Sequence, residues 1–323
     1  MYDYLAKNKN TILPWALALI VLALLAAFPN YASNYWVIRM GPVLLFVILT
    51  VSWVLFSGPT GYMSLAPAAF FGVGIYIAAF LHADVPFAVF ILAGGLAAFV
   101  VALIVGAITL RLRGIYFTIF TFGLVELIKN VVLAYELEVN GIRGRFIILP
   151  EIDNLDIFYA FLVIFAVLLL ATYFIRRSKY GLAMQSIGEY EEAASHMGIN
   201  TTMVKIVTFA ISAFFMGAAG AVWATKLTYI DPGISFNYFY SFMPVLMALF
   251  GGMRQLYGPI LGSVVFTFLK EYLVTKIADL YMVVFGIVML IAILYLPDGL
   301  FGLVQQLWRW GAKQISGERR ANT

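Results

Sequence analysis

Ten long apolar segments restrict what this chain can fold into, because most of them approach the length of a membrane-spanning helix. A helix needs about 20 mainly apolar residues to cross the hydrocarbon core of a bilayer. Hydrophobic residues make up 63% of the 323 residues, and charged residues only 11%. A soluble protein of this length would need more charge to cover its surface. We therefore predict an all-α integral membrane protein with about ten transmembrane helices, at 12–28, 37–56, 63–81, 86–108, 115–134, 157–175, 205–227, 239–253, 257–275 and 280–296.

The connections between these segments are short, so residues 1–323 are expected to form one membrane domain. Segment 239–253 is shorter than the others, which predicts a broken or tilted helix. Two regions stand apart by their polarity: the loop 176–204 and the tail 298–323.

Lysine and arginine residues are distributed unevenly between the two sets of loops. Basic residues concentrate on the cytoplasmic side of membrane proteins. If the N-terminus is cytoplasmic, three basic residues lie in outside loops, at Arg143, Arg145 and Lys276. Both termini, including the tail 298–323, are then expected inside, and the acidic loop 135–156 outside. The inside segments hold twelve basic residues, namely Lys7, Lys9, Arg111, Arg113, Arg176, Arg177, Lys179, Arg254, Arg309, Lys313, Arg319 and Arg320.

Several chemical functions lack the residues that they require. The chain has no cysteine and two histidines, His82 and His196, far apart in sequence. This composition disfavours a metal site or a haem, and no cofactor is expected. No lysine follows a glycine, so the phosphate-binding loop of many ATPases cannot occur. The basic residues lie mostly in loops beside the spans, which does not suggest a nucleic-acid partner. If the protein uses ATP, another chain must bind it.

Glycine and proline interrupt two of the apolar regions. The first stretch contains Ser64, Pro67 and Gly72, and the second contains Gly251, Gly252 and Pro259. Small residues allow helices to approach closely in a membrane, and broken helices can also mark a substrate path. These residues are therefore candidates either for helix packing or for the translocation path.

Few charged residues fall inside the predicted spans. Glu126 and Lys129 are three residues apart and so share one helix face, where they could neutralise each other. Lys270 and Glu271 lie near the outer end of another span. Each pair could be structural, or could line a polar path or relay an ion.

The sequence of the loop 176–204 predicts a short helix on the cytoplasmic surface. Ala183, Ile187, Ala194 and Met197 form an apolar stripe, and Gly198 supplies a helix stop. A surface helix between two spans could be an ordinary connection or a docking element.

The sequence Glu192-Ala193-Ala194-x-x-x-Gly198 resembles the "EAA…G" loop of ABC importer permeases. Over nearly its whole length beyond the first span, the chain resembles the high-affinity branched-chain amino-acid permeases, in particular their M-type subunit. The similar stretches include GYMSLAPAAFFGVGIY at 61–76, RLRGIYFTIFTFGLVEL at 111–127, GGMRQLYGPILGSVV at 251–265 and PDGLFG at 297–302.

This resemblance implies a permease subunit in the inner, or plasma, membrane of a prokaryote. Its implied partners are a homologous second permease, two cytoplasmic ATPase subunits, an extracytoplasmic substrate-binding protein and membrane lipid. The implied contacts with the ATPase are Glu191, Glu192, Ala193, Ala194 and Gly198. Two alternatives remain open: a urea or short-amide ABC permease, and an ion-coupled secondary transporter that uses Glu126.

Overall fold

The computed structural model describes residues 21–81, 85–147, 152–253 and 257–277, together with 280, 283–287, 290, 299 and 302. Two short strands, β1 (Arg145–Phe146) and β2 (Tyr229–Ile230), pair antiparallel. The other elements are helices: η1 (Phe28–Asn30), α2 (Asn34–Thr60), α3 (Pro67–Leu81), α4 (Phe87–Thr109), α5 (Ile115–Tyr135), η2 (Glu136–Asn140), α6 (Asn154–Arg177), α7 (Lys179–His196), α8 (Thr201–Ala224), α9 (Pro232–Ser235), α10 (Phe239–Gly251) and α11 (Tyr257–Lys276).

In the described part of the chain, six helical stretches are long and apolar enough to cross a membrane. They are Asn34–Thr60, Phe87–Thr109, Ile115–Val139, Asn154–Arg177, Thr201–Ala224 and Pro232–Gly251. Each contains or overlaps one of the predicted spans. The all-α membrane architecture therefore agrees with the sequence prediction.

The structure does not establish the other four predicted spans, so it does not confirm a total of ten. Segment 63–81 contains a helix of only 15 residues, α3, and segment 257–275 lies on α11, which is not among the six. Segments 12–28 and 280–296 fall partly or largely outside the described residues, as does almost all of the tail 298–323. Ten spans, and the side on which the termini lie, stay predictions.

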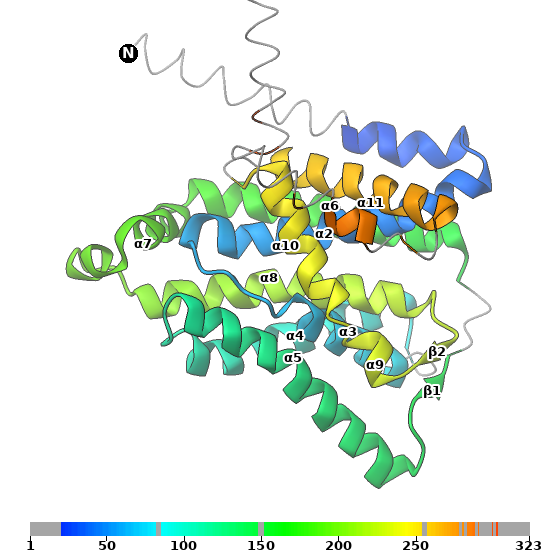
Figure 1. Ribbon diagram of the computed structural model, residues 1–323, viewed down its shortest axis with the longest axis horizontal. Helices are drawn as coiled ribbons and strands as arrows, with labels where there is room; N and C mark the ends of the chain where they lie inside the picture. The colour runs from blue at the N-terminus through cyan, green and yellow to red at the C-terminus, as the bar shows by residue number, and fades with distance from the viewer. Residues whose placement is uncertain are drawn as a thin grey trace, which may run out of the picture.

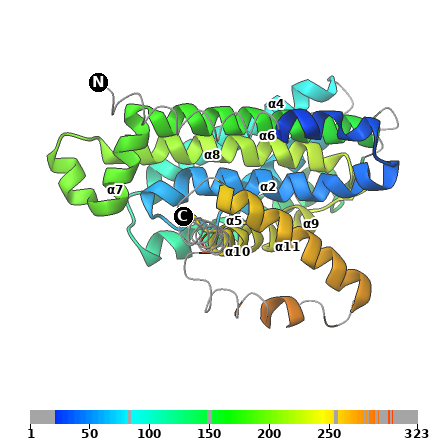
Figure 2. The same ribbon diagram turned by 90° about the horizontal axis from the view of Figure 1, so that it is seen from above.

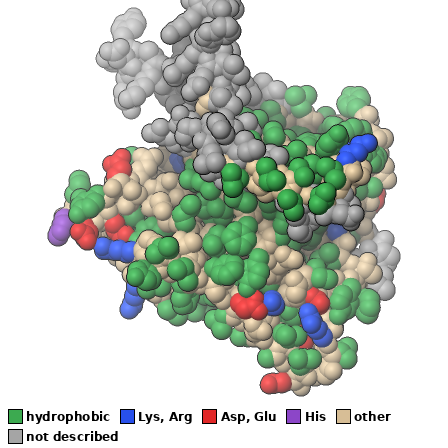
Figure 3. Space-filling view, in the orientation of Figure 1, with side chains coloured by type: hydrophobic (Ala, Val, Ile, Leu, Met, Phe, Trp, Pro, Cys, Tyr) green, Lys and Arg blue, Asp and Glu red, His purple; other side chains and the backbone are tan. Residues whose placement is uncertain are grey.

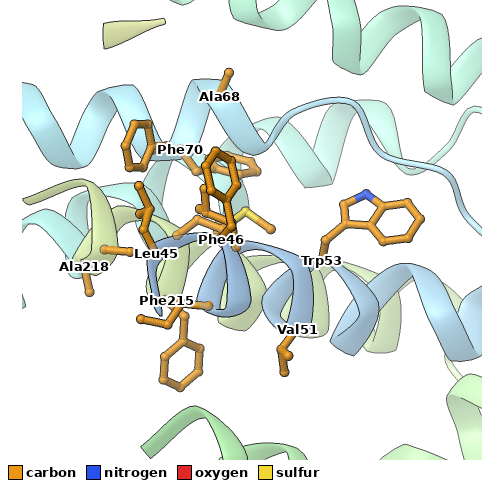
Figure 4. Packing of buried hydrophobic residues seen from close by; sticks show 14 of the residues in the cluster. Leu45, Phe46, Val51, Trp53, Ala68, Phe70, Phe215 and Ala218 are labelled. Carbon is orange, nitrogen blue, oxygen red and sulfur yellow. The ribbon is translucent and has the colours of Figure 1, made fainter. Parts of the chain in front are cut away.

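Helices α2, α6 and α8 run side by side along the long axis, with α7 at one end and the β1–β2 pair at the other (Figure 1). The view from above shows the same parallel arrangement (Figure 2). Helix α2 occupies the centre, and 89% of its most apolar window is buried. It is apolar on every side, as expected for a helix surrounded by others. Figure 4 shows buried side chains of three helices in this core: Leu45, Phe46, Val51 and Trp53 of α2, Ala68 and Phe70 of α3, and Phe215 and Ala218 of α8.

Glycines bring α3, α4 and α8 into backbone contact. A side chain at Gly74 of α3 would collide with the carbonyl of Gly217 on α8, and one at Gly217 would collide with the carbonyl of Gly94 on α4. Such close approach is how small residues join helices without a hydrophobic driving force. This glycine junction holds three helices as one unit.

Residues 61–66 between α2 and α3 are not helical, although the sequence predicts a span from residue 63. The chain leaves α2 at the end near α7 and returns toward the bundle (Figure 1). Side chains satisfy its backbone: Thr121 accepts from the Leu65 amide at 2.9 Å, and Ser241 donates to the Leu65 carbonyl at 2.8 Å. Irregular backbone is tolerated at membrane depth only where protein or water satisfies it. We call residues 61–66 the re-entrant segment.

Polar residues cap the first turns of α6, α7 and α8. Asp153 and Asp156 form a capping box at the start of α6. The Ser178 side chain accepts from the Tyr180 amide, and the Asn200 side chain accepts from the Met203 amide at the start of α8. These caps satisfy amide groups that have no partner inside the helix. They fix α7 as a separate element between two spans.

Candidate coupling and translocation sites

The loop 176–204 contains α7, which protrudes at one end of the molecule (Figure 1). The helix is interrupted at Tyr190, whose backbone is extended, so Glu191–His196 forms a separate helical turn. The predicted surface helix is therefore present but kinked. Three members of its predicted apolar stripe are buried, namely Ala183, Ile187 and Ala194. The fourth, Met197, is 81% exposed and follows the last residue of the helix, so it does not pack with the other three.

Glu191 connects this turn to the membrane part of the protein. Its carboxylate accepts from the Lys205 ammonium at 2.6 Å and from the Tyr62 hydroxyl. Lys205 also donates to the Tyr62 hydroxyl at 2.9 Å and to the Leu110 carbonyl at 3.0 Å. Its side chain is only 3% exposed. We call Tyr62, Glu191 and Lys205 the closed cluster, since its lysine is buried and its hydrogen bonds, including the one to Leu110, join four parts of the chain.

Electrostatics keep Glu191 ionised in this setting. Burial alone would raise the pKa of its carboxyl, but the hydrogen bonds from Lys205 and Tyr62 lower that pKa below its ordinary value. A buried lysine without this carboxylate would be an uncompensated charge. Removing either Glu191 or Lys205 would therefore leave the charge of the other uncompensated.

Three of the other predicted coupling residues, Glu192, Ala193 and Gly198, are exposed. Glu192 forms an exposed ion pair with Arg113 at 2.9 Å, and this hydrogen bond lowers the pKa of the Glu192 carboxyl. Ala193 is exposed, whereas Ala194 is 2% exposed and packs against the hydrophobic core. Gly198 is exposed and has φ +84°, a left-handed conformation that favours glycine. The turn thus presents one face inward and leaves another uncovered.

A polar cleft of about 420 Å³ lies beside this turn. Its walls come from three regions that are distant in sequence: the end of α2 with the start of the re-entrant segment, the α4–α5 connection, and α7. The lining residues are Thr60, Gly61, Tyr62, Arg113, Gly114, Ile187, Gly188, Glu189, Tyr190, Glu191 and Glu192. The end of the molecule that carries α7 therefore contains a cleft with charged side chains in its walls.

The first group of candidate path residues lies in packed protein. Ser64 is 4% exposed, and its carbonyl accepts from the Trp53 indole at 2.7 Å. Pro67 begins α3 and is buried. The ring of Phe236 occupies the space where a side chain at Gly72 would lie. These contacts describe helix packing, and a role in translocation stays a prediction.

The second group joins α10 to α11. The backbone of Gly251 touches that of Gly258, and Pro259 is buried beside it. Gly252 ends α10 with φ +97°. The structure brings Gly251, Gly252 and Pro259 together at one helix connection, and their part in a path likewise stays a prediction.

The charged residues inside the spans separate into two arrangements. Lys129 donates to Glu126 at 2.8 Å, which confirms that they neutralise each other. Lys270 and Glu271 instead have different partners. Glu271 pairs with Arg39 of α2 at 2.8 Å, and the Lys270 ammonium lies 4.3 Å from the centre of the Phe239 ring.

Glu126 lies on an open face of the molecule. Its side chain is 42% exposed, and that of Lys129 is 26% exposed. The Tyr238 hydroxyl, at the start of α10, also donates to the Glu126 carboxylate. We call Glu126, Lys129 and Tyr238 the open cluster. The space-filling view shows acidic and basic side chains next to each other within a largely hydrophobic face over α5 (Figure 3).

Comparison with known proteins identifies the family. The family described as branched-chain amino acid transport system, permease component, matches residues 37–293. The chain belongs to this family. It is therefore a multi-pass membrane permease subunit of an ABC importer, and no enzymatic family is indicated.

Three relatives illustrate the range of the family. The permease is 24% identical to the high-affinity branched-chain amino acid transport system permease protein LivM of Salmonella typhimurium, over 94% of this chain and 78% of LivM. It is 28% identical to BraD of Pseudomonas aeruginosa, a permease protein of the same kind of system, over 44% of this chain and 46% of BraD. The ribose import permease protein RbsC of Haemophilus influenzae is 27% identical over 41% of this chain and 42% of RbsC. No solved structure matches the permease.

Sequence reasoning did not find three residues of the two clusters. Tyr62 and Lys205 complete the closed cluster around Glu191, and Tyr238 completes the open cluster around Glu126. One signal was available for Lys205: it is the first residue of the predicted apolar span 205–227, and a charge drawn into a span needs a partner. Nothing in the sequence marks which of the many tyrosines would join either carboxylate.

Proposed function

We propose that this permease forms half of a membrane channel that imports branched-chain or related amino acids, driven by ATP hydrolysis on partner subunits. The closed cluster is the observation that carries the proposal. It ties the outward-facing turn at Glu191 to Lys205 of α8 and to Tyr62 of the re-entrant segment. A partner that moves this turn would therefore move backbone that enters the membrane.

The proposed assembly contains a homologous second permease, two ATPase subunits at the α7 end and a substrate-binding protein at the opposite end. Exposed Glu192, Ala193 and Gly198 supply a surface for the ATPase. The amino-acid substrate is proposed from the LivM and BraD relatives, whose names state branched-chain amino acid transport. Closure of the ATPase pair would switch the channel between outward and inward access.

The test is uptake by the complete complex in sealed vesicles. We expect labelled leucine to accumulate when ATP is present on the α7 side, with no dependence on a proton or sodium gradient. The permease purified without partners should hydrolyse no ATP, since its sequence lacks a Gly-Lys phosphate loop. Uptake that follows an ion gradient without ATP would instead support a secondary transporter.

The proposed orientation places α7 and both termini in the cytoplasm and the β1–β2 end outside. The permease has no natural cysteine, so single cysteines can be introduced without background. In sealed cells, an impermeant thiol reagent added outside should label Val139→Cys and not Ser195→Cys; both native residues are exposed. The reverse pattern would contradict the orientation.

A further inference from the structure

The open cluster is set deep in α5. Glu126 lies 11 residues after Ile115, the first residue of a 21-residue helix. At 1.5 Å per residue this places it about 16 Å along the helix, close to the middle of a hydrocarbon core of about 30 Å. Charged side chains at this depth face protein or water rather than lipid, and they mark functional paths. A partly exposed ion pair here therefore borders either a polar path or a partner subunit.

The cluster presents both signs of charge within one small region. Both oxygens of Glu126 accept from the Lys129 ammonium, at 2.8 and 3.0 Å. The Asn130 amide donates to one of them at 3.1 Å, and Tyr238 donates to the other. The carboxylate can accept from an ammonium group, while Lys129, Asn130 and Tyr238 are donors that a carboxylate could accept from.

An aromatic wall adjoins these charges. Phe122 is one helical turn before Glu126, and its ring stacks on Tyr238 with centroids 4.7 Å apart. Phe242 lies 5.8 Å from Phe122 and is 42% exposed. The open cluster thus combines opposite charges with an exposed apolar surface at a distance of about one helical turn, 5.4 Å.

We infer that the open cluster is a transit site for an α-amino acid zwitterion with an apolar side chain. The substrate ammonium would take the place of Lys129 on Glu126, and the substrate carboxylate would accept from Lys129 and Tyr238. The side chain would lie against Phe122 and Phe242. Since Glu126 and Lys129 neutralise each other when no substrate is present, exchanging partners changes no net charge in the membrane.

The opposite charges also discriminate between solute classes. A neutral solute such as a sugar or urea offers no pair of full charges to exchange with Glu126 and Lys129. A carboxylic acid or an amine alone would leave one member of the pair unmatched, which is unfavourable away from water. This inference rests on the proposed amino-acid import function and assigns residues to it.

The test uses the complete complex, reconstituted in vesicles with ATP on the α7 side and saturating leucine-loaded binding protein. Glu126→Gln, and the double change Glu126→Gln with Lys129→Gln, should lower leucine uptake at least tenfold while ATP hydrolysis and recovery of the assembled complex are retained. The double variant leaves no unpaired charge, so a folding defect of the single variant does not decide the result.

Glu271→Gln is the matched control. Glu271 also lies on an apolar helix, pairs with a cation at 2.8 Å and is 34% exposed, but it is outside the open cluster. Its uptake should stay within twofold of the unchanged permease. Normal uptake by both Glu126 variants would overturn the transit site, and so would loss of the second permease from the complex, which would make the open cluster a subunit contact. If the unchanged complex imports a neutral solute and no amino acid, the proposed function itself fails.

Discussion

The closed and open clusters are built from the same three kinds of side chain, yet their surroundings differ. In each, a glutamate accepts from a lysine and from a tyrosine. The lysine is 3% exposed in the closed cluster and 26% exposed in the open one. The closed cluster joins residues up to 143 positions apart; in the open cluster Glu126 and Lys129 lie on one helix, and Tyr238 is 112 positions from Glu126. The same chemistry therefore fastens parts of the fold together at one place and stays available for exchange at the other.

The largest expected effect is a difference in the free energy of unfolding between variants of Glu191 and variants of Glu126. Glu191→Gln leaves the buried Lys205 charge without its partner, and breaking such a pair costs about 3–5 kcal/mol. Glu126→Gln should cost less than Glu191→Gln, because the Lys129 side chain is 26% exposed and is not enclosed as Lys205 is. Thermal unfolding of the purified permease in detergent would measure both.

Restoring charge balance is the control for this comparison. Adding Lys205→Met to Glu191→Gln removes both charges and should recover most of the lost stability. Equal destabilisation by Glu191→Gln and Glu126→Gln would show that burial does not distinguish the clusters.

Ala193 and Ala194 test which face of the turn that carries Glu191 packs inward and which is free to contact a partner. Ala194 is 2% exposed, so Ala194→Trp should overpack the permease itself and lower its stability by about 1–3 kcal/mol. Ala193 is exposed, so Ala193→Trp should leave the isolated permease stable and impair ATP-driven uptake by the assembled complex. Unfolding and uptake should be measured on both variants. Normal uptake by Ala193→Trp at normal abundance would remove this face from the ATPase contact.

Gly198 tests whether the end of the same turn depends on backbone conformation. Its φ of +84° disfavours a β-branched residue, so Gly198→Val should destabilise the turn by about 1–2 kcal/mol. Among the described residues, apart from Gly198 and its two chain neighbours, no atom lies within 4 Å of the Cβ position that a side chain would take, so volume alone should be tolerated. Gly198→Asn, which adopts this conformation more readily, should retain more uptake than Gly198→Val. Equal uptake by the two would argue against a conformational role.

The smallest expected effect is a pH dependence of the closed cluster. The lowered pKa of Glu191 means that its contribution to stability is present above the ordinary value of 4.5 and is lost as pH falls through the lowered pKa. Unfolding between pH 7 and pH 3.5 should show this acid loss, and Glu191→Gln should reduce it. Glu192→Gln is the control, because its partner Arg113 is exposed and stays solvated. An acid loss that is the same in all three proteins would assign it to other carboxyls.

Much of the fold can be predicted from the apolar runs alone. The predicted spans 86–108 and 115–134 differ by a residue at most from the ends of α4 and α5. The re-entrant segment could not be predicted, because Thr121 and Ser241, which satisfy its backbone, are 56 and 176 residues away from Leu65. An apolar run favours a helix unless distant side chains replace the helical hydrogen bonds.

The candidate site also contains one part that the sequence predicts and one part that it does not. The pair of Glu126 and Lys129 follows from helical spacing, since residues three apart share a face. The closed cluster depends on tertiary contacts across 14, 129 and 143 positions. The EAA-like motif indicates where coupling occurs, but burial separates Ala193 from Ala194, and the motif treats them alike.

The glycine junction limits which parts of the permease can act as hinges. Where Gly74, Gly94 and Gly217 bring backbones together, the neighbouring side chains are those of Ala98 and Ala221, which have no rotamer to change and so absorb little displacement. Helices α3, α4 and α8 should therefore travel as one rigid lever during a transport cycle. Helix α8 carries Lys205 near the α7 end, so a displacement applied at the closed cluster should be passed on to α3 and α4 through this junction.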